Sequence, residues 1–194
     1  MNIRYNSKSI LKNITWKVKQ GEKWAVTGGN GSGKSTLLSL VYADNPQAYA
    51  NVIHLFDQRR GHGESFWQIK QRIGFTSPEL HAYFHENLSA QEVVLTGLTD
   101  TFVVPNNFEE SSLDFMNSIF EYFEISDIAN MKFARLSTGT QRLVLLIGAL
   151  IKAPPVLLLD EPFQGMDAAM VFRCKYLIKN ILNENHTLIF ISHF

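Results

Sequence analysis

The sequence has little of what would place it in several common classes of protein. It contains a single cysteine, Cys174, which excludes an internal disulfide and a cysteine-based metal site among these 194 residues. Lysine and arginine total 18, as do aspartate and glutamate, so the net charge of zero makes nucleic acid an unlikely partner and gives no reason to expect acidic lipid. The longest apolar run, Leu143 to Ile151, is too short to span a bilayer. We therefore expect a cytoplasmic protein.

What the chain does contain suits one soluble globular domain with a substantial core. Apolar residues make up 45% of it and charged residues only 19%. The nearest approach to a local basic patch is a set of four side chains, Arg59, Arg60, Lys70 and Arg72.

A glycine-rich stretch, Gly28 to Thr36, carries the clearest functional signal. It satisfies the phosphate-loop pattern G-x-x-x-x-G-K-[ST], between a strand-like run, Lys23 to Thr27, and a helix-like run, Ser35 to Tyr42. Such a loop lets backbone N–H groups surround phosphate at the positive end of a helix. We expect Lys34 to contact the β- and γ-phosphates and the Ser35 hydroxyl to bind Mg²⁺. The predicted nucleotide-binding residues are Gly28, Gly29, Asn30, Gly31, Ser32, Gly33, Lys34, Ser35 and Thr36.

An apolar strand ending in two carboxylates supplies the acidic partner that such a loop needs. The run V-L-L-L begins at Val156 and leads into Asp160 and Glu161. Asp160 is positioned to hold Mg²⁺ through water, and Glu161 to orient or deprotonate an attacking water. The alternative is a solvated strand-end turn.

A third motif, L-S-T-G-T-Q-R from Leu136, by itself indicates a loop with Ser137 capping a helix. Together with the two motifs above, it resembles the signature L-S-G-G-Q of the ATP-binding-cassette (ABC) ATPases. Thr138 and Thr140 replace the first glycine and the glutamine of that signature. The resemblance implies that Ser137 and Gly139 cap the γ-phosphate of ATP bound to a partner cassette.

Three smaller matches extend the resemblance. Tyr5 occupies the place of the family's adenine-stacking aromatic, and Asp167 that of the D-loop aspartate. His193 ends the last strand, like the switch histidine that contacts the γ-phosphate. The plainer alternatives are an edge-strand aromatic for Tyr5, a helix cap for Asp167 and an ordinary terminal residue for His193.

A narrower likeness is to the ModF/PhrA group, molybdate-transport-associated ATP-binding proteins also labelled photorepair proteins. Members of this group can carry two cassettes in tandem, and this chain resembles the second more than the first. The segments that carry the likeness are Ser39 to Tyr49, Leu55 to Arg60, Gly63 to Phe75 and Leu80-His81.

One departure from the family concerns the segment Ser77-Pro78-Glu79. The family usually places a glutamine here, which touches Mg²⁺ or the attacking water and links the site to a transmembrane partner. Its absence weighs against ordinary transporter coupling. Glu79 is a candidate substitute, one position out of register.

The fold class implied is α/β, a P-loop NTPase of ABC-cassette architecture within a single domain, 1–194. It combines a mostly parallel core sheet, a small antiparallel β subdomain and a helical subdomain at about 82–138. In that subdomain Ser111 or Ser112 is a candidate cap for a helix with an apolar face. Strands are predicted at 1–5, 10–18, 23–27, 52–56, 73–76, 156–159 and 187–191, and the stretch 45–50 is predicted to be a loop.

The family's first strand normally begins before Tyr5, and further elements follow the switch histidine. We therefore expect both ends of this chain to be truncated.

The function implied is ATP hydrolysis coupled to closure of two cassettes, as a homodimer or a tandem pair, with ATP and Mg²⁺ bound. Three uses remain open. The first is the energy-coupling subunit of a transporter for molybdate or another small anion, at the inner face of the cell membrane with a permease. The others are a soluble ATPase acting on nucleic acid or another macromolecule, and an ATP-gated interaction module with little turnover.

Overall fold

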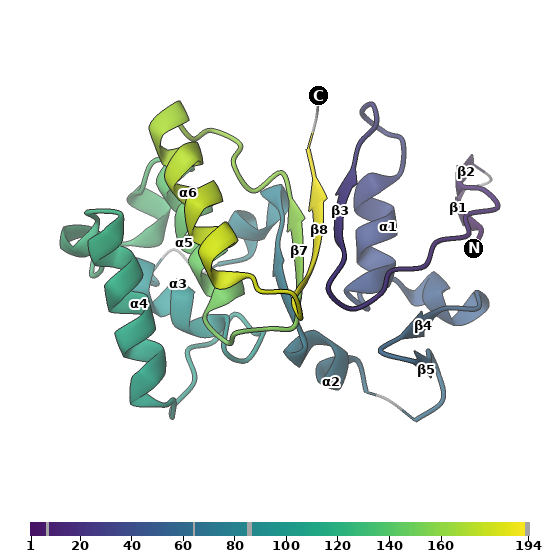
Figure 1. The fold of residues 1–194 in the computed structure, drawn as a ribbon, viewed down its shortest axis with the longest axis horizontal. Helices are drawn as coiled ribbons and strands as arrows, with labels where there is room; N and C mark the ends of the chain where they lie inside the picture. Colours follow the sequence, from purple (N-terminus) through teal and green to yellow (C-terminus); the bar gives the residue numbers. More distant parts are fainter. Residues whose placement is uncertain (7, 64, 85–86, 193–194) are drawn as a thin grey trace.

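The computed structural model describes every residue except 7, 64, 85–86 and 193–194 (Figure 1). Its strands are β1 (Ile3–Tyr5), β2 (Lys8–Leu11), β3 (Lys23–Val26), β4 (His54–Leu55), β5 (Gln58–Arg59), β6 (Ile73–Thr76), β7 (Val156–Asp160) and β8 (Thr187–Ile191). Its α-helices are α1 (Lys34–Val41), α2 (Phe66–Gln71), α3 (Ala90–Thr96), α4 (Glu110–Tyr122), α5 (Thr138–Leu150) and α6 (Ala168–Ile181). Short 3₁₀ helices are η1 (Pro46–Ala50), η2 (Pro78–Tyr83), η3 (Ser126–Ile128) and η4 (Phe133–Arg135).

The core is a parallel sheet with the strand order β3-β8-β7-β6. The first four residues of β7, 156–159, are all apolar because helices cover both faces of the sheet, with α1 on one side and α5 and α6 on the other (Figure 1). Leu157 and Leu159 pack among the residues of α3 to α6, whereas Leu158 packs against α1 and α2. Because successive side chains of a strand point to opposite faces of the sheet, β7 contributes to two separate apolar clusters.

The sheet order brings four loops to one edge. In a parallel sheet the carboxyl ends of all strands lie at the same edge, where open α/β sheets bind their ligands. The loops that begin there start at Thr27, Ser77, Glu161 and Ser192. Since β8 lies between β3 and β7, Ser192 follows β8 between the start of the glycine-rich loop and the acidic pair.

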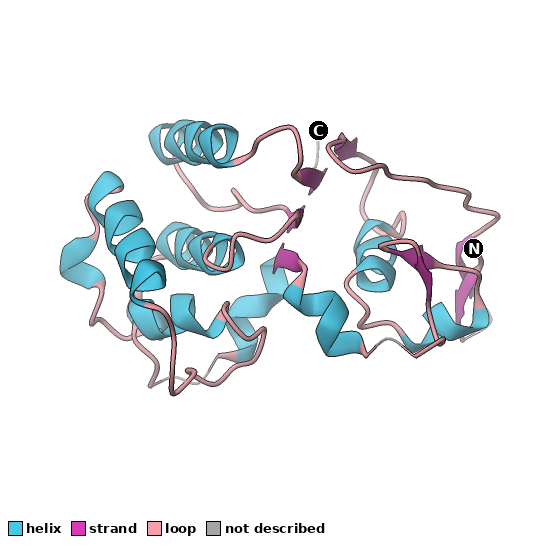
Figure 2. Ribbon diagram, turned by 60° about the horizontal axis from the view of Figure 1, so that its bottom comes forward, coloured by secondary structure: helices cyan, strands magenta, loops and turns pink. Residues whose placement is uncertain are grey.

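The residues between β6 and α5 are mainly helical where they are described, and they extend to one side of the sheet (Figure 2). The end of helix α3 approaches α5 closely because a glycine lies on each side of the contact, Gly97 just after α3 and Gly148 within α5. A Cβ atom added at Gly97 would lie 2.1 Å from the carbonyl oxygen of Gly148, so any larger residue would force these helices apart. Ser89 starts α3 with a capping box completed by Glu92.

Two predicted strands are shorter than expected, for reasons of backbone conformation. The strand predicted at 10–18 ends at Leu11, since Asn13 adopts a left-handed conformation with φ of 53° that breaks the extended chain. The strand predicted at 52–56 is only His54–Leu55. Phe56 and Asp57, with φ of 53° and 66°, form the two-residue turn into β5, a strand that was not predicted.

Two further local predictions were wrong. Helix α4 begins at Glu110 with Glu109 as its N-cap, so Ser111 and Ser112 lie inside the first turn and neither caps it. The predicted loop at 45–50 contains η1, which starts at Pro46 because the Asn45 side chain accepts a hydrogen bond from the Gln47 amide.

A buried ion pair joins the segment after α3 to the core. Lys152, which follows α5, donates to both carboxylate oxygens of Asp100 and to the Lys70 carbonyl at the end of α2. The Lys152 and Asp100 side chains are only 8% and 7% exposed. Burial raises the pKa of Asp100 and lowers that of Lys152, and the attraction between the two opposes both shifts.

We expect Asp100→Asn to lower the free energy of unfolding by about 3–5 kcal/mol, because it leaves the Lys152 ammonium buried without its charged partner. Asparagine tolerates the left-handed φ of 53° at this position, and the double variant Asp100→Asn/Lys152→Met, which removes both charges, should recover most of that loss. Urea unfolding of the two variants measures the difference. The matched control is Glu124→Gln, which breaks the exposed pair with Arg173 and should cost under about 1 kcal/mol. Equal losses in all three variants would contradict the assignment.

Candidate functional site

The glycine-rich loop lies where the sequence places it, between β3 and the first residue of α1, Lys34. The residue before the helix, Gly33, has φ of 95°, a left-handed conformation that glycine adopts without strain. A Cβ atom there would lie 2.8 Å from Leu11 Cδ2 and 3.1 Å from Ile10 Cγ2. The loop therefore packs against β2. Gly33 is required both by its left-handed φ and by this close contact.

Lys34 closes the loop on itself. Lys34 is only 9% exposed. Its ammonium donates to the carbonyl oxygens of Gly28 (2.7 Å) and Gly29 (3.1 Å). The ammonium thus lies against the two carbonyl groups that begin the loop. A charge held there can meet a phosphate that enters the loop.

Ser35 and Asp160 join the loop to the acidic strand. The Ser35 hydroxyl donates to Asp160 Oδ2 at 2.9 Å. The two residues belong to the loop-helix unit after β3 and to the end of β7, two strands that are separated in the sheet by β8. Asp160 is 3% exposed, and burial raises its pKa, with the charges of Glu161 and Glu79 adding to the rise and the Ser35 bond opposing it. A hydroxyl beside a carboxylate is an oxygen donor set that suits Mg²⁺.

Glu161 adopts an uncommon backbone conformation at the end of β7. Its φ is 47°, and its amide donates to the Ile191 carbonyl at 3.0 Å. Left-handed non-glycine residues are held only where their surroundings impose them, and they cluster at functional sites. The Glu161 side chain is half-buried at this turn, directly after Asp160.

The signature-like segment caps helix α5 as predicted. The Ser137 side chain accepts from the Thr140 amide at 3.2 Å, and its hydroxyl pairs with that of Thr140 at 2.8 Å. A Cβ atom at Gly139 would lie 2.7 Å from the Gly165 carbonyl oxygen, so this glycine allows a close approach. Within the described residues, no hydrogen bond of Ser137 reaches the glycine-rich loop of the same chain.

Asp167 caps α6, as one of its two predicted roles requires, by accepting from the Met170 amide at 2.8 Å. Tyr5 is 47% exposed as a residue, and its hydroxyl accepts from Asn45 Nδ2 at 2.9 Å. Its ring therefore remains open to a stacking partner. The predicted His193 lies outside the described residues.

The predicted basic cluster is not a free basic surface. Lys70 pairs with Asp44, and Arg72 lies over the Phe56 ring at 3.7 Å. Arg60 is buried against Tyr49. Three of these four cations are thus engaged within the chain.

Sequence reasoning missed Arg142, although a charged residue in an apolar helix was a signal for it. Arg142 is 5% exposed and donates through Nη1 to the carbonyl oxygens of Ser77 (3.3 Å) and Pro78 (2.6 Å). Its contacts reach the segment where the family's glutamine is absent.

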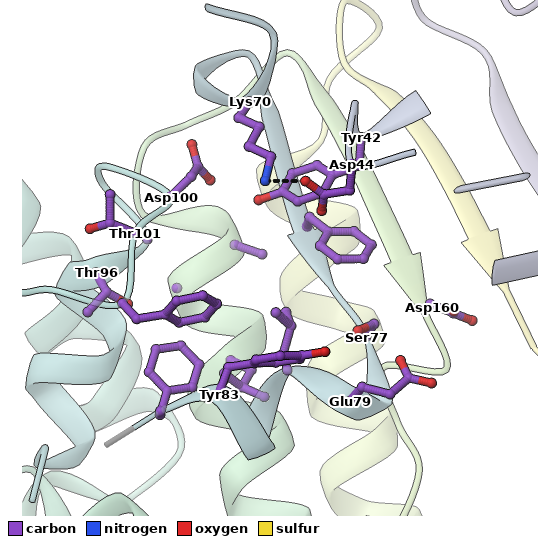
Figure 3. A pocket seen from close by; sticks show the side chains of 18 of the residues that line it. Tyr42, Asp44, Lys70, Ser77, Glu79, Tyr83, Thr96, Asp100, Thr101 and Asp160 are labelled. Atoms are coloured by element: carbon purple, nitrogen blue, oxygen red, sulfur yellow. Dashed lines mark ion pairs between the residues drawn. The ribbon is translucent and has the colours of Figure 1, made fainter. Parts of the chain in front are cut away.

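A pocket of about 530 Å³ begins beside Ser35 and Asp160 and runs away from the glycine-rich loop between α1, β6, η2 and α3 (Figure 3). Aromatic rings line its middle, and carboxyl groups lie toward both ends. Figure 3 shows Glu79 and Asp160 at one end and Asp44 and Asp100 at the other.

Within the described residues, no helix is long and apolar enough to cross a bilayer.

Comparisons with known proteins agree with this geometry. The sequence pattern of the family described as ABC transporter matches residues 11–164. The chain is 38% identical over 193 residues to the ABC transporter ATP-binding protein ModF of Escherichia coli (strain K12), covering 98% of this chain. It is 32% identical over its whole length to an uncharacterized ABC transporter ATP-binding protein, YmeB, of Lactococcus lactis, of which it covers 74%.

A solved ATP-binding cassette, captured as a dimer after hydrolysis and bound to ADP and Pi, has the same fold. Its TM-score is 0.78 at 21% identity, over 100% of this chain and 84% of the other. The chain spans only 39% of the length of the Escherichia coli ModF protein. The similarity therefore concerns one cassette rather than that whole protein.

Gly33→Ala should destabilise the protein by about 1–3 kcal/mol, because alanine would be strained at this φ and would collide with β2. Gly29→Ala is the matched control. An added Cβ there meets nothing within 4 Å, so its effect should stay within about 0.5 kcal/mol. Guanidinium unfolding compares the two variants, and a Gly33→Ala protein as stable as Gly29→Ala would refute the seating of the loop on β2.

Proposed function

Since this chain belongs to the ABC transporter family of ATP-binding proteins, we propose that it binds Mg-ATP and hydrolyses it to ADP and phosphate. The observation that carries the proposal is the hydrogen bond from Ser35 to Asp160, which joins a phosphate loop to an acidic strand end. Lys34 lies beside the first of these residues and Glu161 beside the second. The relatives named as ATP-binding proteins support the choice of nucleotide.

Each residue has a definite task in this proposal. The amides of the 28–36 loop and the Lys34 ammonium hold the phosphates, and the exposed Tyr5 ring stacks on the adenine. Mg²⁺, held by Ser35 and Asp160, would neutralise charge that develops on the phosphates. Glu161 orients the attacking water and accepts its proton, while His193 steadies the γ-phosphate.

A second cassette completes the site. Ser137 and Gly139 begin a helix whose amides can bind a phosphate, yet no hydrogen bond of Ser137 in the described part reaches its own phosphate loop. We therefore propose that they cap ATP on a partner cassette, in a homodimer or a tandem pair, with Asp167 near the contact. The dimeric cassette among the solved structures supports this arrangement.

We propose that this ATPase cycle supplies energy to a transport-type system at the inner face of the membrane. The likeness to ModF favours a molybdate-related system. Residues 82–138 would form the helical subdomain that meets a permease. The competing use is a soluble ATPase acting on another macromolecule, favoured by Ser77 and Pro78 standing where the family has glutamine. A permease that copurifies only with the ATP-bound cassette would decide for transport.

Lys34→Ala should weaken ATP binding at least tenfold, because it removes a charge-assisted hydrogen bond worth about 1.5–3 kcal/mol. Isothermal titration calorimetry measures the affinity. Lys179→Ala removes an exposed lysine of α6, which covers the opposite face of the sheet from α1, and should bind ATP as wild type does. Unchanged affinity in a folded Lys34→Ala protein would remove the loop from nucleotide binding.

Glu161→Gln keeps the shape of the side chain but removes the base, so turnover should fall about 10²–10⁴-fold while ATP binding survives. Because ATP favours closure and hydrolysis releases it, this variant should accumulate as an ATP-dependent dimer. Steady-state turnover and light scattering with and without Mg-ATP test both outcomes. Adding Ser137→Arg to Glu161→Gln is the control, which should block the dimer and leave ATP binding at Lys34 intact. Near-normal turnover in Glu161→Gln would remove this residue from its role.

A further inference from the structure

The segment after β6 lies beside the nucleotide end of the sheet. Strand β6 pairs with β7, with Thr76 opposite Leu159, so Ser77 emerges next to the end of the strand that carries Asp160. The chain then enters η2 at Pro78, and η2 packs against α5. The position that usually carries the family's glutamine is therefore part of a turn pressed against the signature helix.

Arg142 holds this turn from within α5. Its Nη1 donates to the Ser77 and Pro78 carbonyl oxygens, while its Nε has no hydrogen-bond partner in the part of the chain that the structure describes. A guanidinium buried in a helix whose next residues, 143–150, are mainly apolar is costly unless nearby groups compensate for it. Burial lowers its pKa, and the carboxylates of Glu79 and Glu161 oppose that shift.

Glu79 lies in the first turn of η2, directly after the two carbonyl groups that Arg142 binds. It lines the pocket together with Ser35 and Asp160, and its carboxyl group and that of Asp160 point to the same side of that pocket (Figure 3). In the described part of the chain, no group of three or more histidine, cysteine, aspartate or glutamate side chains is placed so that it could hold a metal ion. Any contribution of Glu79 to a cation held by Ser35 and Asp160 would therefore pass through an intervening water.

We infer that Arg142 is a positioning residue, which locks the Ser77–Glu79 turn to α5 and so holds Glu79 beside Ser35 and Asp160 in place of the missing glutamine. The inference rests on the proposed ATPase function for its catalytic consequence, but not for the lock itself. Because Ser137 and Gly139 begin the same helix, the lock also ties the signature to the Mg²⁺ end of the site. A displacement of α5 would then move Glu79 with it.

The lock is tested without nucleotide by hydrogen exchange. Arg142→Met keeps a long unbranched side chain that suits an apolar helix, but it lacks the Nη1 group that donates both hydrogen bonds. Amides in 77–83, including that of Leu80, which donates to Ser77 O at 3.3 Å, should exchange at least tenfold faster. Arg135→Met, which changes an exposed arginine before the signature, should leave exchange unchanged. Equal protection of 77–83 in wild type and Arg142→Met would overturn the inference.

The consequence for the site is tested by Mg²⁺ dependence. Arg142→Met and Glu79→Ala should each raise the Mg²⁺ concentration for half-maximal turnover at least fivefold, and both should bind ATP without Mg²⁺ as wild type does. Arg142→Lys keeps the charge with one donor group and should lie between Arg142→Met and wild type. Unchanged Mg²⁺ dependence in Glu79→Ala would remove Glu79 from the site. If wild type and Arg135→Met both fail to hydrolyse ATP, the proposed function fails, whereas the exchange result still decides the lock.

Discussion

The hydrogen bond between Ser35 and Asp160 depends on the position of one strand. Strand β8 lies between β3 and β7, and its width sets the separation between the phosphate loop and the acidic pair. The same strand accepts the Glu161 amide at Ile191, which turns that residue out of the strand direction. The position of β8 therefore fixes how the phosphate loop after β3 lies relative to the acidic pair at the end of β7.

Helix α5 serves the core and the site together. Its buried residues pack against β7, α3 and α6, and glycines at 97 and 148 allow α3 to lie unusually close. The same helix begins with the capped signature and carries Arg142, whose contacts fasten the end of β6. Packing that stabilises the domain therefore also positions the groups proposed to meet ATP.

The two threonines that depart from the family's signature have structural partners. Thr140 pairs its hydroxyl with that of Ser137, and Thr138 packs near Gly165, where an added Cβ would lie 3.2 Å from the threonine methyl. A Ser137 already engaged in capping has its hydroxyl fixed in direction. In the proposed closed dimer it would meet a phosphate without first losing rotational freedom.

The sequence by itself determined the α/β class, the phosphate loop, the acidic strand end and the caps at Ser137 and Asp167, since each depends on residues adjacent along the chain. It could not determine that β2 stops near Asn13, because a left-handed asparagine is allowed by the sequence but not required by it. Only the tertiary structure decided that β8 separates β3 from β7, that Asp100 is buried against Lys152, and that Arg142 binds the turn at Ser77. These contacts join residues far apart in the chain, and strand order and burial place them rather than any local pattern.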